Sequence, residues 1–78
     1  MEKLNKSEQK IIDKLVLGNG PEVITNPFSG VQCKLDPTGV ALYDFIQGCQ
    51  IIGNYKEFDH ARYAFAKLYP DEYMKLLD

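Results

Sequence analysis

The sequence has no tryptophan, only one histidine and only two cysteines. Catalysis that depends on histidine therefore has one candidate, His60. Its charged neighbours indicate an exposed helical turn, and nothing indicates the partner and cleft that acid–base chemistry needs. Ser7 and Ser29 lack the surroundings of a nucleophile elbow. We expect no catalytic residue and predict that the protein is not an enzyme.

The two cysteines, Cys33 and Cys49, do not form a Cys-x-x-Cys motif. Together with His60 they make three potential zinc ligands, but their spacing matches no chelating pattern. Cys49 lies in an apolar helical stripe, where a cysteine packs as a small hydrophobe. A secreted chain this short more often carries roughly four or more cysteines. We therefore expect two reduced thiols, no disulfide, no metal and no cofactor.

Long apolar runs and an excess of basic charge are also absent. The first ten residues are polar, unlike a signal peptide, and no stretch approaches the roughly 20 apolar residues that span a bilayer. Nine basic against 11 acidic residues give a net charge of −2, which argues against a nucleic-acid partner. With 78 residues, of which 45% are apolar, we expect one globular cytoplasmic domain over residues 1–78 and no membrane partner.

Three capping patterns predict helix starts, because each pairs an N-cap residue with a residue suited to the first turn. They are Asn5 with Glu8, Asp36 with Pro37, and Asn54 with Glu57. Ser7 is an alternative cap for the first helix. Apolar residues follow each pattern at helical spacing, with Leu15 and Val16 still on the first helix. That helix ends at residues 18–21, the second at Gly53 and the third at Pro70, after which a short C-terminal helix begins.

Between the first two helices the apolar pattern changes to the alternation typical of a strand. Val31, Cys33 and Leu35 alternate with polar residues, and residues 23–25 favour β-structure. The intervening residues 26–30, Asn-Pro-Phe-Ser-Gly, are typical of a turn. We predict a short β-hairpin that lies on helices. The predicted fold is α+β and mostly helical: an N-terminal helix, a short β-hairpin, two longer helices and a short C-terminal helix.

Apolar side chains exceed what one face of each helix needs. The second predicted helix carries two apolar stripes, and the third is apolar almost all round. Either the third helix is central and enclosed, or an aromatic patch stays exposed for a protein partner or a second copy of the chain. We choose Phe28, Tyr55, Tyr63 and Tyr73 as the candidate interaction surface. Ordinary core packing of the tyrosines is the competing interpretation.

The tight junction before Asn54 supports an alternative hypothesis. Two helices joined by a short turn are typical of helix-turn-helix proteins. The candidate recognition helix carries Lys56, His60, Arg62 and Lys67. The same helix carries Glu57 and Asp59, and its apolar residues leave little polar face for a groove. A small DNA-binding regulator that uses the second and third helices is therefore the alternative function.

Two stretches together resemble a known group of proteins. They are Asn-Pro-Phe-Ser-Gly at 26–30 with Leu-Asp-Pro at 35–37, and Ala-Leu-Tyr-Asp-Phe-Ile-Gln-Gly at 41–48 with the ending Tyr69-Pro70…Tyr73…Leu76-Leu77. Over residues 25–78 the pattern is similar to small, uncharacterised proteins of tailed bacteriophages. The resemblance carries over no functional residue. It implies a phage gene product in the host cytoplasm, and with the missing catalytic residues it favours a non-enzymatic accessory protein that binds a host or defence component, or itself.

Overall fold

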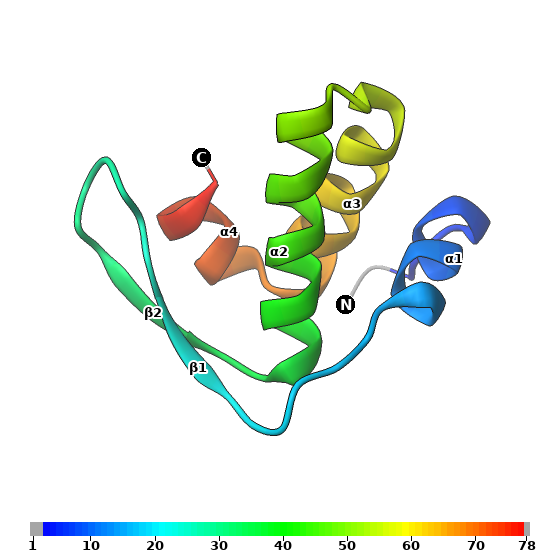
Figure 1. Cartoon of the computed structure of the whole chain (residues 1–78). Coiled ribbons are helices and arrows are strands. Elements are labelled where there is room, and N and C mark those ends of the chain that lie inside the picture. Colours follow the sequence, from blue (N-terminus) through cyan, green and yellow to red (C-terminus); the bar gives the residue numbers. More distant parts are fainter. Residues whose placement is uncertain (1–2, 78) are drawn as a thin grey trace.

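Within residues 3–77, which the computed structural model describes, four helices pack together and one β-hairpin lies at the side of this group, next to α2 and α4 (Figure 1). In chain order the elements are α1 (Lys6–Lys14), β1 (Glu22–Thr25), β2 (Gln32–Leu35), α2 (Pro37–Ile52), α3 (Tyr55–Leu68) and α4 (Pro70–Leu76). This order confirms the predicted α+β, mostly helical fold. No helix in this part of the chain is long and apolar enough to cross a bilayer.

The first helix begins as predicted but ends earlier. Asn5 and Glu8 form the complete capping box, with each side chain accepting a hydrogen bond from the other residue's backbone N–H. The prediction that Leu15 and Val16 continue the helix is wrong, because the backbone at Leu15 is extended (φ −66°, ψ 139°). That turn leads the chain away toward the hairpin, so Val16 leaves the apolar face and is 90% exposed.

The junction between α2 and α3 is a tight turn through Gly53, which adopts a left-handed conformation (φ 78°). Asn54 caps α3 by accepting a hydrogen bond from Glu57 N. The predicted second capping box is only half formed, because the Asn54 N–H donates to the carbonyl of Cys49 at 2.9 Å. The Cys49 carbonyl at the end of α2 therefore accepts the hydrogen bond from the Asn54 N–H that the Glu57 side chain was expected to accept.

The hairpin pairs β1 and β2 in an antiparallel register that runs from Glu22 opposite Leu35 to Thr25 opposite Gln32. On β2 the exposed and buried residues alternate, and Cys33 and Leu35 are the buried ones. This face lies against α2 and α4, as the prediction of a hairpin resting on helices requires.

Helix α3 is the central helix, because α1, α2 and α4 all pack against it. Its residues Ala61, Ala64 and Phe65 have no exposed surface. The central position predicted for the third helix is thus confirmed, whereas its enclosure is only partial, because Tyr55 is 67% and Tyr63 is 54% exposed, and the alternative of an exposed aromatic patch stays open. The apolar stripes of α2 are buried only in part, since Ile51 is 84% and Ile52 is 76% exposed. These two residues belong to the last turn of α2, which extends beyond the ends of α1 and α4, so neither of those helices covers it (Figure 1).

Candidate functional site

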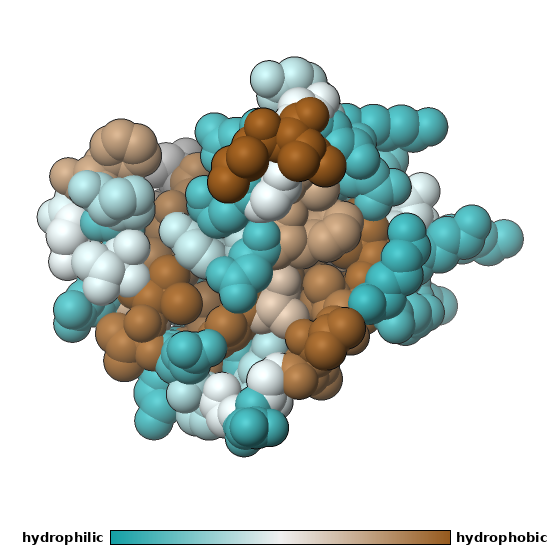
Figure 2. Space-filling view, in the orientation of Figure 1, coloured by the Kyte–Doolittle hydropathy of each residue, from teal (hydrophilic) through white to brown (hydrophobic). Residues whose placement is uncertain are grey.

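A cleft of about 600 Å³ lies between the hairpin turn and the helices α2, α3 and α4. Aromatic and aliphatic side chains form much of its lining. They are Pro27, Phe28, Tyr43, Phe58, Leu76 and Leu77. Figure 2 shows that apolar residues also gather over the hairpin and over the end of α2. The volume falls within the range of about 300–1,000 Å³ that ligand pockets span.

The polar part of the lining is mostly uncharged. Asn26 and Ser29 come from the hairpin turn, Gln47 and Gln50 from α2, and Arg62 from α3. Arg62 is therefore the one charged side chain that lines the cleft within residues 3–77. Tyr43 and Gln47 are four residues apart on α2, as are Phe58 and Arg62 on α3, so each pair shares one helix face.

Asn26 fixes the turn that forms one wall of the cleft. Its side chain is buried, and its carbonyl oxygen accepts hydrogen bonds from Phe28 N at 2.8 Å and Ser29 N at 3.2 Å. Its amide nitrogen donates to the carbonyl of Lys75 in α4 at 2.8 Å. The bond to Lys75 fixes the hairpin turn to α4. The two bonds from the turn backbone hold Phe28 at the tip, where 96% of its surface is exposed.

A second polar contact positions α4 at the base of the fold. The Tyr69 hydroxyl donates to the Asp36 carboxylate at 2.6 Å, and the same carboxylate caps α2. Burial of the ring, together with this bond and the charge of Asp36, raises the pKa of Tyr69 well above its ordinary value. The phenol therefore stays protonated and keeps donating across the whole physiological range.

Arg62 has an unusual environment. Its guanidinium carbon lies 5.8 Å from the centre of the Phe58 ring and 5.4 Å from that of Tyr63, so aromatic rings hold the group in place. Nη2 is 3.7 Å from the Asp59 carboxylate in a partly exposed pair. Nε is buried and has no hydrogen-bond partner among residues 3–77. A buried donor without an acceptor is unfavourable, so a ligand that accepts a hydrogen bond from Arg62 would remove this cost.

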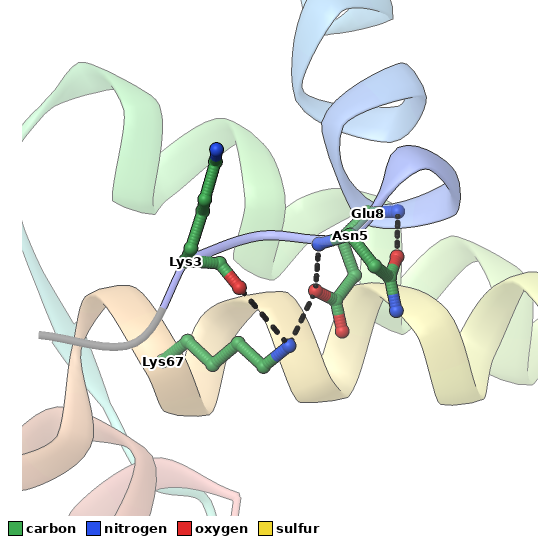
Figure 3. Close-up of polar contacts among 4 residues, drawn as sticks. All are labelled: Lys3, Asn5, Glu8 and Lys67. Atoms are coloured by element: carbon green, nitrogen blue, oxygen red, sulfur yellow. Dashed lines mark hydrogen bonds and ion pairs between the residues drawn. The ribbon is translucent and has the colours of Figure 1, made fainter.

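Glu8 and Lys67 join α1 to α3 away from the cleft (Figure 3). The Glu8 side chain is only 2% exposed, and one of its oxygens accepts from both Asn5 N and Lys67 Nζ, the latter at 2.7 Å. Burial by itself raises the pKa of Glu8, but the hydrogen bonds from Lys67 and Asn5 and the charge of Lys67 outweigh it and lower the pKa overall. The carboxylate therefore stays ionised and holds the lysine.

The four residues of the predicted interaction surface lie in different environments. Phe28 lines the cleft. Tyr55 is 67% exposed at the start of α3, and Tyr63 is 54% exposed beneath the Arg62 guanidinium. Tyr73 is partly buried and packs against the core. The cleft thus brings together only Phe28 and, through Arg62, Tyr63, and the interaction role of all four stays a prediction.

The residues considered for a metal site do not gather. Cys33 and Cys49 are both buried and free. Burial, and then the charge of Glu57, raises the pKa of the Cys49 thiol. Within residues 3–77 no three His, Cys, Asp or Glu side chains are grouped closely enough to hold an ion.

The predicted DNA-recognition helix is α3, and its basic residues differ in availability. Lys56 is exposed, whereas Lys67 is held by the buried Glu8 and Arg62 lies over two rings. The exposed residues of α3 are Tyr55, Lys56, Asp59 and Tyr63, so its free face carries one basic and one acidic side chain and does not form a basic surface for a groove. DNA binding stays an untested prediction, and no feature of the structure strengthens it.

Comparison with protein-family models, with curated proteins and with solved structures found no match. The resemblance to phage proteins therefore stays a prediction from the sequence, and the cleft is interpreted from the chemistry of its own residues.

Proposed function

We propose that this protein is a non-enzymatic accessory protein of a tailed bacteriophage that acts by binding another protein through the cleft and the Phe28 tip. The exposed Phe28 on an ordered turn is the observation that carries the proposal. Burying a phenylalanine side chain stabilises a fold or a complex by about 1.5–3 kcal/mol, and the 96% exposed Phe28 contributes almost none of this to the folding of the chain. A binding partner that covers the Phe28 ring would therefore add this free energy to the stability of the complex.

The rigidity of the turn supports the same proposal. Ordering a flexible loop costs free energy on binding, whereas the Asn26 side chain already fixes the backbone next to Phe28. The surface behind the tip combines an apolar floor with uncharged polar groups. Protein interfaces have this composition, with an apolar centre, aromatic anchors and a polar rim.

The biological setting comes from the sequence alone. The resemblance over residues 25–78 to tailed-phage proteins supports a phage gene product that works in the host cytoplasm. Two free cysteines fit a reducing compartment. A host or defence-system component, or a second copy of the chain, is then the expected partner.

Capture from a host lysate, combined with light scattering of the pure protein, tests the proposal. We expect the wild type to retain one bacterial protein or to self-associate, and Phe28→Ser to lose that binding. Ile51→Ser is the matched control, because Ile51 is 84% exposed but does not line the cleft. A strictly monomeric wild type that retains nothing would contradict the proposal.

A further inference from the structure

We infer that the cleft binds a segment of a partner protein that carries an aspartate or glutamate beside an apolar residue, and that Arg62 pairs with this carboxylate. The inference rests on the proposed function and specifies the chemistry of the partner. It depends on three features of the cleft: its charge, the state of Arg62, and the groups around Arg62.

The charge of the lining selects an acidic occupant. Arg62 is the one charged side chain among the lining residues, and no carboxylate shares the cleft with it in the described part of the chain. The Asp59 carboxylate lies 3.7 Å from Nη2, but it is 56% exposed and does not line the cleft, so it offsets the charge of Arg62 only in part and the cleft still favours an anion over a cation. The overall charge of the protein is −2, so this preference is a property of the cleft and not of the whole surface.

The Arg62 guanidinium is arranged to accept a carboxylate. Stacking near Phe58 and Tyr63 limits its side-chain freedom before any ligand arrives, which reduces the ordering cost. Its contact with Asp59 is long and partly exposed, and such pairs contribute little. A partner carboxylate can replace that contact without a large loss.

The unpaired Nε adds to the expected affinity. About a third of the Arg62 side chain is exposed (34%), and a carboxylate meets this part first. Because Nε itself has no accessible surface, it reaches the ligand only after a rotation of the side chain. The carboxylate then accepts from Nε and one Nη in a bidentate pair, which is the strongest arrangement open to arginine.

The neighbouring groups favour a polypeptide over a small anion. Tyr43, Phe58 and Leu76 offer an apolar floor for a side chain beside the carboxylate. Gln47 and Gln50 line the same cleft, and no hydrogen bond involves the side-chain amide of either within residues 3–77. Each amide offers donors and an acceptor, which match the C=O and N–H groups of a peptide backbone.

Two bead-displayed libraries of random heptapeptides test the inference. Both are amidated at the C-terminus, so side chains supply every carboxylate, and the second library contains Asn and Gln in place of Asp and Glu. We expect the wild type to enrich peptides with an acidic residue next to an apolar one from the first library only. We expect Arg62→Gln to bind the enriched peptides at least about tenfold more weakly, since it removes a charged bidentate pair.

Matched variants separate the cleft from general electrostatics. Lys56→Gln removes a positive charge from the exposed surface of the same helix, outside the cleft lining, and should change binding less than about twofold. Arg62→Lys keeps the charge but loses the planar fork, so we expect intermediate affinity. The backbone amide NMR spectrum checks that each variant is folded. In the wild type, the Arg62 Nε–H resonance should shift when an enriched acidic peptide is added.

The outcomes distinguish the inference from the proposed function. Equal enrichment from both libraries, or unchanged binding by folded Arg62→Gln, overturns the inference and leaves the proposed function standing. Failure of the wild type to enrich any peptide beyond the Phe28→Ser variant overturns the inference, and it overturns the proposed function as well only if the wild type is also strictly monomeric and retains no protein from the lysate. Self-association that Arg62→Gln abolishes, without peptide binding, identifies a second copy as the occupant and also overturns the inference.

Discussion

Replacing Glu8 by glutamine tests how α1 is held on the central helix. Glutamine keeps the shape of the side chain and an oxygen for the Asn5 N–H, so the helix cap survives. The substitution removes the negative charge that accepts from Lys67 Nζ at 2.7 Å. Lys67 is left facing a neutral amide at a site where its former partner is 2% exposed.

The structure sets the expected magnitude. Removing one partner of a fully buried ion pair costs about 3–5 kcal/mol. Lys67 is 21% exposed and can turn partly toward water, so we expect a smaller loss of about 2 kcal/mol, as for a hydrogen bond to a charged group. For a domain of this size that is a large share of the total free energy of unfolding.

Urea unfolding followed by circular dichroism at neutral pH measures this loss. A double-mutant cycle with Lys67→Met isolates the interaction between the two side chains from the separate effects of each substitution. We expect a favourable coupling energy of about 1–2 kcal/mol. A folded Glu8→Gln protein within about 0.5 kcal/mol of the wild type, or a coupling energy near zero, would refute the idea that this pair holds α1.

The same pair predicts a dependence on pH. The pKa of Glu8 in the folded protein lies below its ordinary value of 4.5. Its stabilising contribution is therefore complete above that ordinary value and disappears as the pH falls through the lower folded pKa. Wild-type stability should decrease over this acidic range more steeply than that of Glu8→Gln. Parallel curves for the two proteins would show that Glu8 is not the group responsible.

Three further predictions concern the turns and the helix packing. Asn26→Ala removes the hydrogen bonds that tie the hairpin turn to α4 and should cost about 2 kcal/mol in urea unfolding; a neutral result would mean that water replaces them. Gly53→Ala forces a side chain into a left-handed conformation and should cost about 1–2 kcal/mol in thermal unfolding, and no loss would contradict the assigned turn. Gly39→Ala places a Cβ 3.1 Å from the nearest side-chain atom and should cost about 1–3 kcal/mol, whereas Gly18→Ala, with open space around it, should not share that loss.

Local patterns were enough to predict the order and type of the elements. The Asn5 cap, the Asp36-Pro37 start and the hairpin turn depend on interactions within a few residues, so they can be derived from the sequence. The failure at Leu15 has a different cause. Leu15 fits the helical stripe and packs against the core, but the helix ends before it because the chain has to turn toward the hairpin, and that direction is not encoded in the local pattern.

The cleft could not be predicted because four separate segments form it. Sequence spacing places Phe58 and Arg62 on one helix face, and Tyr43 and Gln47 on another. No local pattern shows that these faces meet, or that the Phe28 turn stands opposite them. The contacts that decide this are distant in sequence, such as the bond from Asn26 to the backbone of α4, 49 residues later.

The hydrogen bond between the hairpin turn and α4 also has a practical consequence for handling the protein. Leu76 and Leu77 directly follow Lys75, whose carbonyl accepts this bond, and both line the cleft, so a probe attached to the last turn of α4 would obstruct whatever binds there. A fluorescent or spin label for an interaction screen therefore belongs on α1, which packs against α3 at a distance from the hairpin turn (Figure 1). A label in that position reports binding without covering the binding surface.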